Sequence, residues 1–246
     1  MAESNPYPYQ PDTLHVINSI TKDFTSALVG KAIDEGLIKN VNQPVLSFFP
    51  NRKVENTSDF KSSLTLKNLL TMTAGFDWSE DGNYGADYDS NTQMWRSENQ
   101  VQFMLDRPVK EKPGSKFYYT TGASHLMSGI LSQVTGKTSN EYAQEKLLGP
   151  IGVKNIVWAL DNQGINSGGS RLFISPEDLA RFGFLYLHGG KWDGTQILSQ
   201  SWVSESTSKH IETPNGLAGR SGYGYQWWMN PFGGYSGRGY AGQYLF

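Results

Sequence analysis

The sequence predicts an α+β fold, in which an antiparallel sheet is flanked by helices and a mostly helical region is inserted between its parts. Helical patterns dominate the middle of the chain, whereas strand-like patterns cluster near its ends. Residues 223–230 and 236–246 are predicted as two strands around the turn 231–234. We therefore expect one domain over residues 1–246, with 1–60 and 200–246 associated with the sheet and 61–199 mostly helical.

Each helix is predicted from apolar residues at helical spacing, together with residues that begin or end helices. A helix over residues 20–35 ends before Gly36, and Pro176 begins a helix over 176–188. Further helices are expected at residues 64–72, 99–105, 124–134 and 140–148, and within 192–208. Residues 76–95 are predicted as a long loop, and loops of this length are usually functional or mobile.

The composition excludes several classes of function. The 246 residues are 37% hydrophobic and 18% charged, as in a globular protein with a sizeable core. A net charge of −2, without a long run of Lys or Arg, argues against nucleic acid as a partner. No stretch is long and apolar enough to cross a membrane. The chain has no Cys, and its four His are scattered without ligand spacing, so we expect no metal site and no cofactor.

Three pairs of Ser and Lys stand three residues apart: Ser19 and Lys22, Ser58 and Lys61, Ser206 and Lys209. Residues with this spacing lie on one face of a helix, where a lysine of suppressed charge can activate a serine as a nucleophile. Ser58 and Ser206 lie in polar stretches. Only Ser19 follows a short apolar run, residues 14–17, and precedes an amphipathic helix. The alternative is that Ser19 caps the helix and Lys22 is solvated.

Several motifs in order make the chain resemble the class C β-lactamase-related serine hydrolases, a penicillin-binding-protein-like family whose signature is S-x-x-K. This group includes esterases and 6-aminohexanoate-dimer hydrolases. The matching stretches are residues 14–30, 69–75, 113–126, 134–136, 175–183, 223–228 and 239–243. The resemblance implies the β-lactamase fold and an acyl-enzyme on Ser19. It also suggests a periplasmic or secreted protein, although residues 1–11 have no signal-peptide layout and leave the compartment undetermined.

The second motif of the family, Tyr-x-Asn or Tyr-x-Ser, is similar to Tyr119-Thr120-Thr121, with Tyr118 as the neighbouring candidate. The resemblance implies that Tyr119 transfers protons beside Lys22, as a phenol whose pKa is lowered by nearby positive charge. It also implies that Thr121 contacts the substrate, because Thr121 keeps a hydroxyl in place of Asn or Ser.

The third motif of the family, Lys-Thr-Gly or His-x-Gly, is similar to Gly237-Arg238-Gly239 at the predicted substrate-binding edge. The backbone N–H of Tyr240 would complete an oxyanion hole with that of Ser19. Gly237 stands where penicillin-processing relatives place a cation, and the side chain of Arg238 is expected to face the other way. We therefore expect short esters or uncharged amides to be cleaved better than β-lactams.

Other interpretations remain open from the sequence. The chain could be a β-lactamase or D-Ala-D-Ala peptidase, or a non-catalytic or truncated relative that acts as a binding module, and its C-terminal strand suggests a fragment. The oligomeric state is undetermined. Residues assigned to the loop or the cleft wall, rather than to catalysis, are Asp77, Glu80, Asp81, Tyr84, Tyr88, Trp95, Gly168, Gly169 and Arg171.

Overall fold

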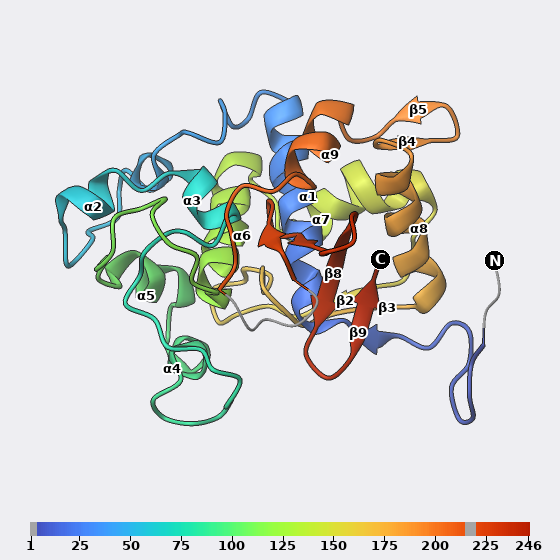
Figure 1. Cartoon of the computed structure of the whole chain (residues 1–246), viewed down its shortest axis with the longest axis horizontal. Helices are drawn as coiled ribbons and strands as arrows, with labels where there is room; N and C mark the ends of the chain where they lie inside the picture. Colours follow the sequence, from blue (N-terminus) through green and yellow to red (C-terminus); the bar gives the residue numbers. More distant parts are fainter. Residues whose placement is uncertain (1–3, 215–219) are drawn as a thin grey trace.

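The computed structural model describes residues 4–214 and 220–246, so the first three residues of the N-terminal segment lie outside the described part. Helix α1 (Thr21–Asp34) runs through the middle of the molecule (Figure 1), and nearly all of its residues are buried. It packs against α6 (Thr121–Thr135), α7 (Ser139–Ala143) and α9 (Gln200–Ser206). Packing on several sides therefore fixes the first turn of α1.

The predicted helices are confirmed, with shifts of a few residues at their ends. Helix α6 begins three residues earlier than expected and ends at Gly136, whose φ of 66° gives a left-handed cap. The prediction of a loop over residues 76–95 is wrong for its last part, because helix α4 (Ser90–Arg96) begins there, with Asp89 as its cap. The remaining helical segments are η1 (Asn18–Ile20), η2 (Val45–Phe48), α2 (Asp59–Ser62), α3 (Leu66–Leu70), α5 (Gln100–Asp106), η3 (Gln144–Leu148), η4 (Gly149–Ile151) and α8 (Pro176–Leu187).

The described residues form three antiparallel sheets. The first has the order β1-β3-β2, from β1 (His15–Val16), β3 (Leu172–Ile174) and β2 (Val157–Trp158). The second pairs β4 (Lys191–Trp192) with β5 (Thr195–Gln196). The third has the order β6-β7-β8-β9, from β6 (Gly222–Tyr223), β7 (Trp228–Met229), β8 (Tyr235–Gly239) and β9 (Gln243–Leu245). The α+β class with antiparallel sheets is thus confirmed, although residues 61–199 also contribute strands β2 to β5.

Two predicted strands are interrupted by turns. The expected strand 236–246 is a hairpin of β8 and β9, because Ala241 and Gly242 take positive φ angles of 67° and 97°. The expected strand 223–230 is broken at Gln226, which has a φ of 73° and donates its backbone N–H to the carbonyl of Leu70. Both turns form where the chain meets another element, so alternation of apolar residues did not predict them.

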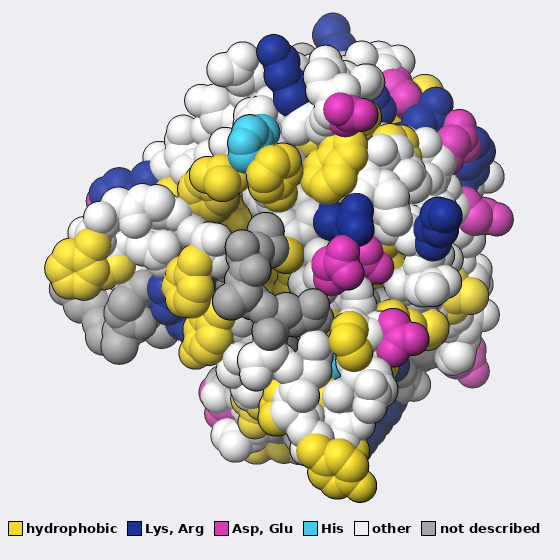
Figure 2. Space-filling model, turned by 90° about the vertical axis from the view of Figure 1, so that its right-hand side faces the viewer, with side chains coloured by type: hydrophobic (Ala, Val, Ile, Leu, Met, Phe, Trp, Pro, Cys, Tyr) yellow, Lys and Arg dark blue, Asp and Glu magenta, His cyan; other side chains and the backbone are white. Residues whose placement is uncertain are grey.

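The aromatic ring of Phe24 on α1 stacks on that of Phe182 on α8, with 3.9 Å between centroids, and so joins the central helix to the outer one. Figure 2 shows the face on the α8 side, where apolar side chains lie among charges of both signs. Hollows of about 600 and 390 Å³ on this side are lined chiefly by α8 and its neighbours, and not by Ser19. Within residues 4–214 and 220–246, no helix is long and apolar enough to cross a membrane.

Candidate active site

The first candidate nucleophile, Ser19, lies in the short 3₁₀ turn η1 between strand β1 and helix α1. The preceding residue, Asn18, has a φ of 45°, a conformation that Asn tolerates better than most residues. Its side-chain amide donates to the carbonyl of Tyr240 at 2.8 Å and to Oε1 of Gln243 at 3.0 Å. The turn that bears Ser19 is therefore tied to the β8–β9 hairpin.

The Lys22 side chain is buried within hydrogen-bonding distance of Ser19. Its Nζ lies 3.0 Å from Ser19 Oγ and donates to the carbonyl of Gly169 at 2.7 Å. Burial lowers the pKa of Lys22 to about 8, whereas the charges of Glu80 and Asp23 act in the opposite direction. A substantial fraction of Lys22 is therefore neutral at mildly alkaline pH and able to accept a proton.

The other two Ser–Lys pairs have structural roles. Ser58 caps α2, and the Lys61 amine donates to the backbone carbonyls of Glu55 and Leu105, each at 2.7 Å. The Ser206 hydroxyl donates to a carbonyl within α9, and Lys209 forms an exposed ion pair with Glu212. Among the three pairs, only Ser19 and Lys22 bring the amine to the hydroxyl.

Tyr119 lies beside this pair, whereas Tyr118 is 43% exposed. The Nζ atom of Lys22 is 4.9 Å from the centroid of the Tyr119 ring, and the ring stacks on Trp228 at 5.7 Å and 20°. The expected lowering of the Tyr119 pKa is wrong. Burial and the charge of Glu80 raise that pKa well above its usual value, although a hydrogen bond with Ser19 opposes them. Tyr119 is therefore a neutral phenol.

Thr121 is buried and is turned toward Glu80, which the sequence predicts to lie in a solvated loop. Its backbone N–H and hydroxyl donate to the two Glu80 oxygens at 2.8 and 2.5 Å. The Trp78 indole and the Tyr84 phenol donate to the same carboxylate at 2.8 and 3.2 Å. Thr121 thus holds Glu80 at the start of α6, where an acidic group also interacts favourably with the helix dipole.

Gly168 and Gly169 lie between α1 and α6. The Gly169 carbonyl accepts a hydrogen bond from the Lys22 amine, and the Gly168 carbonyl accepts one from the Thr25 hydroxyl at 2.7 Å. A Cβ atom on Gly168 would collide with the Ser124 carbonyl on α6. Glycine is required here for close approach, and the segment positions the Lys22 amine.

The third motif lies along the turn that bears Ser19, with its residues on two faces of β8. A Cβ atom on Gly237 would collide with Asp23 Oδ2, and one on Gly239 would lie 2.6 Å from the Ile17 carbonyl. Both glycines therefore face the start of α1. Arg238 points to the opposite face, where its Nε donates to Ser236 Oγ at 3.0 Å and its Nη2 to Asn230 Oδ1 at 2.9 Å.

Aromatic residues of loop 76–95 and of the β8–β9 hairpin lie together near the turn that bears Ser19. The ring of Tyr84 meets that of Tyr240 edge-on at 5.2 Å and lies 6.1 Å from that of Trp95. The Arg171 guanidinium lies 4.7 Å from the centroid of the Trp95 ring. Tyr88 instead is 55% exposed and donates to Asp81. Loop 76–95, segment 168–171 and the β8–β9 hairpin are thereby brought together.

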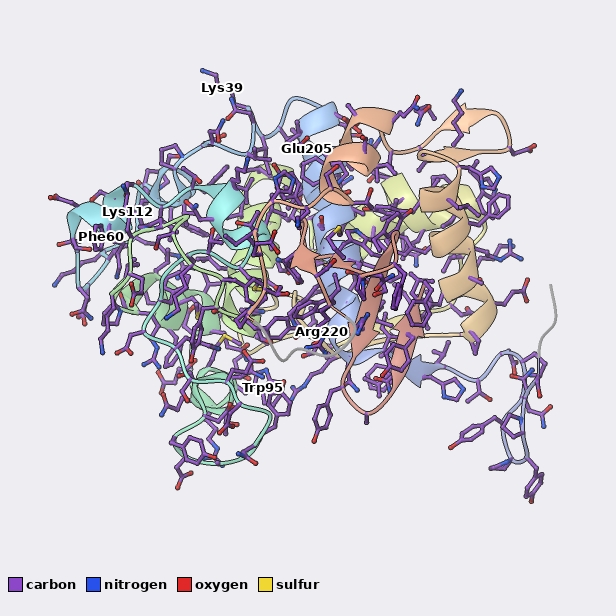
Figure 3. All side chains as sticks on the ribbon, viewed as in Figure 1. Lys39, Phe60, Trp95, Lys112, Glu205 and Arg220 are labelled. Atoms are coloured by element: carbon purple, nitrogen blue, oxygen red, sulfur yellow. The ribbon has the colours of Figure 1, made fainter. Side chains whose placement is uncertain are left out.

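Sequence reasoning missed three residues near Tyr119: Glu80, Trp228 and Arg220. The Arg220 guanidinium lies 4.2 Å from the centroid of the Trp228 ring, and Figure 3 shows Arg220 in the lower centre, where the N-terminal end of α1 is also drawn. For Glu80, the only indication of a role in the neighbouring sequence was that it follows Trp78 by two residues. Nothing near Arg220 in the sequence indicated a role for it.

Comparisons with known proteins bear on the family and the fold of the chain. The Beta-lactamase family model matches residues 2–246. A 6-aminohexanoate-dimer hydrolase of Paenarthrobacter ureafaciens is 26% identical over 259 residues, which cover 97% of this chain. The chain spans only 64% of the length of that relative.

Solved structures share the fold. A Bacillus anthracis protein proposed to be a 6-aminohexanoate-dimer hydrolase has a TM-score of 0.83 and 23% identity, and the match covers 99% of this chain and 66% of that one. A family VIII carboxylesterase has a TM-score of 0.68 and 18% identity, with 90% and 69% covered. At these identities the likeness establishes the fold alone.

Proposed function

The chain belongs to the Beta-lactamase family, and on this premise we propose that it cleaves an ester or amide bond through an acyl-enzyme on Ser19. The observation that carries the proposal is the 3.0 Å distance between Lys22 Nζ and Ser19 Oγ, beside the Tyr119 ring. A buried lysine with a lowered pKa is a suitable base for a serine hydroxyl.

In the first step Ser19 Oγ attacks the carbonyl carbon, and its proton passes to Lys22. The backbone N–H groups of Ser19 and Tyr240 stabilise the negative oxygen that forms. The bond to the alcohol or amine then breaks, and that group takes the proton from Lys22 by way of the neutral Tyr119 phenol. Water attacks the acyl-enzyme in the same manner and releases the acid, so no cofactor takes part.

Ser19→Ala should abolish labelling by a fluorophosphonate probe and lower kcat/KM for p-nitrophenyl butyrate by a factor of about 10⁴ or more. Ser58→Ala and Ser206→Ala are the matched controls, because the Ser58 hydroxyl accepts from the backbone N–H of Lys61 and the Ser206 hydroxyl donates to the carbonyl of Val203, away from Ser19. Mass spectrometry of the labelled wild type should identify Ser19. Labelling that survives in Ser19→Ala would refute the mechanism, and a wild type that is neither labelled nor active would favour a non-catalytic relative. Hydrolysis of nitrocefin in preference to the ester would favour a β-lactamase.

A further inference from the structure

The position of the Lys22 amine depends on a segment outside helix α1. Residues 159–171 connect β2 to β3, and the carbonyl of Gly169 in this segment accepts a hydrogen bond from Lys22 Nζ at 2.7 Å. Among the residues that the structure describes, the other hydrogen-bond partner of this amine is Ser19 Oγ, at 3.0 Å. Because hydrogen bonds are directional, the orientation of the amine depends on where segment 159–171 lies.

The two limbs of this segment are paired with each other. The backbone N–H of Ser167 donates to the carbonyl of Ala159 at 2.8 Å, and the N–H of Ala159 donates to the carbonyl of Arg171 at 3.1 Å. The turn 161–165 lies between these limbs. A displacement of this turn is therefore expected to reach the Gly169 carbonyl.

A buried pair of side chains holds the turn of this segment on helix α6. The Nε2 atom of His125, on α6, lies 3.0 Å from Asp161 Oδ2, and each of the two side chains is 1% exposed. The other carboxylate oxygen, Asp161 Oδ1, accepts the backbone N–H groups of Gln163 and Ile165 at 2.8 and 2.9 Å. One oxygen of Asp161 thus closes the turn, and the other joins it to α6.

The surroundings of this pair indicate where its protons lie. Burial alone would raise the pKa of Asp161, but hydrogen bonds from His125 and from the two backbone N–H groups lower that pKa below its usual value. Asp161 is therefore a carboxylate that only accepts, so Nε2 of His125 carries the proton of the bond. The buried Nδ1 of His125 has no hydrogen-bond partner in the described part of the chain. The pair is thus joined by one charge-assisted hydrogen bond.

We propose that His125 and Asp161 are positioning residues for the Lys22 amine, which they place by holding segment 159–171 on α6. This inference rests on the proposed function, since it adds two residues to the same site. The two side chains bond to each other and to the turn of the segment, so their effect on the reaction passes through the Gly169 carbonyl.

The rate of labelling by a fluorophosphonate probe tests this role separately from folding. His125→Leu removes the donor, so it should slow labelling by about 10- to 100-fold while every folded molecule is still labelled in the end. His125→Gln should restore nearly the wild-type rate, because its amide can donate to Asp161 from the place of Nε2. Tyr142→Phe is the control, because it removes a buried hydrogen bond of 3.0 Å to Glu35, at the other end of α1.

A merely structural role would have a different result. His125→Leu would then lower the melting temperature and the fraction of molecules labelled, but the folded molecules would react at the wild-type rate. If His125→Leu does not fold, His125→Asn takes its place, because its shorter amide keeps the polarity but does not reach Asp161. His125→Asn should be labelled as slowly as is expected for His125→Leu.

Hydrogen exchange followed by mass spectrometry tests the pair without any need for activity. Exchange of the amides in residues 159–171 should be faster in His125→Leu than in wild type, His125→Gln and Tyr142→Phe. This pattern together with a wild type that the probe does not label would refute the proposed function and support the pair as the anchor of the segment. Labelling of folded His125→Leu at the wild-type rate, slow labelling of His125→Gln, or unchanged exchange in residues 159–171 would overturn the positioning role.

Discussion

At the scale of single residues, the proton on Lys22 controls the proposed chemistry. Lys22 is 1% exposed, and burial lowers its pKa to about 8. Two carboxyl groups oppose that effect: Glu80, whose oxygens accept four hydrogen bonds, and Asp23, which is buried and whose pKa is itself raised by burial. Because the charge of Glu80 stabilises protonated Lys22, Glu80 raises the Lys22 pKa against the larger effect of burial.

We expect kcat/KM for p-nitrophenyl butyrate to rise with pH and to level off above about pH 8, as Lys22 loses its proton. Glu80→Gln removes a negative charge that raises the Lys22 pKa, so the rise should move to lower pH. If Glu80→Gln acted only by removing hydrogen bonds, kcat would fall, but the rise of kcat/KM would stay at the same pH. The exposed neighbour Asp81 supplies the control variant Asp81→Asn, which should leave the profile in place. If kcat/KM of Glu80→Gln rose at the same pH as in the wild type, or at a higher pH, the role given to Glu80 would be contradicted.

At the scale of elements, strand β8 lies directly against the start of α1. The contact depends on glycine, because a Cβ atom on Gly237 would meet the Asp23 carboxylate and lie 3.3 Å from Ile20. Neither the helical pattern of α1 nor the alternation in β8 predicts this approach. The space that a side chain at position 237 would enter is thus occupied by the Asp23 carboxyl group.

Gly237→Ala should lower the free energy of unfolding by about 1–3 kcal/mol, the usual cost of overpacking a core. In an Asp23→Ala background the same substitution should cost clearly less, because the colliding oxygen is gone. Urea denaturation of the four proteins of this double-mutant cycle measures the coupling. Additive costs would mean that strand and helix separate to relieve the collision, contrary to the tight contact described here.

At the scale of the whole molecule, one set of buried apolar residues connects the helical region with the sheets. Phe24 on α1, Leu126 on α6, Leu172 on β3 and Trp227 beside β7 belong to the same cluster. Because the two parts share this core, neither has a separate hydrophobic core of its own. We therefore continue to predict a single domain over residues 1–246, because the two parts share this core.

Urea unfolding of residues 1–246 should therefore show one transition, with the same midpoint by tryptophan fluorescence and by far-ultraviolet circular dichroism. The seven tryptophans report on both the helical and sheet parts, so the two signals sample the whole core. Two transitions with separate midpoints would instead mean that residues 61–199 unfold independently of the sheets.

The sequence alone predicted most of the helices and favoured Ser19 over the other two candidate serines. Helical periodicity, Pro176 and Gly136 marked helices to within a few residues, because such signals act through local backbone geometry. The apolar run before Ser19 distinguished it from Ser58 and Ser206. The Tyr119 register and the place of the third motif came from the ordered motifs of the family.

Only the tertiary structure showed which charged groups lie near one another and which faces of the elements are in contact. The Tyr119 pKa rises because folding buries the phenol, and no residue near it in sequence indicated that burial. Glu80 lies near Tyr119 although it is 39 residues away in the sequence, and Arg220 contacts Trp228, on which Tyr119 stacks. Alternation correctly placed Arg238 opposite Gly237, but only strand pairing showed which face carries Tyr119. Local pattern determines which residues share a face, whereas long-range packing determines what that face meets.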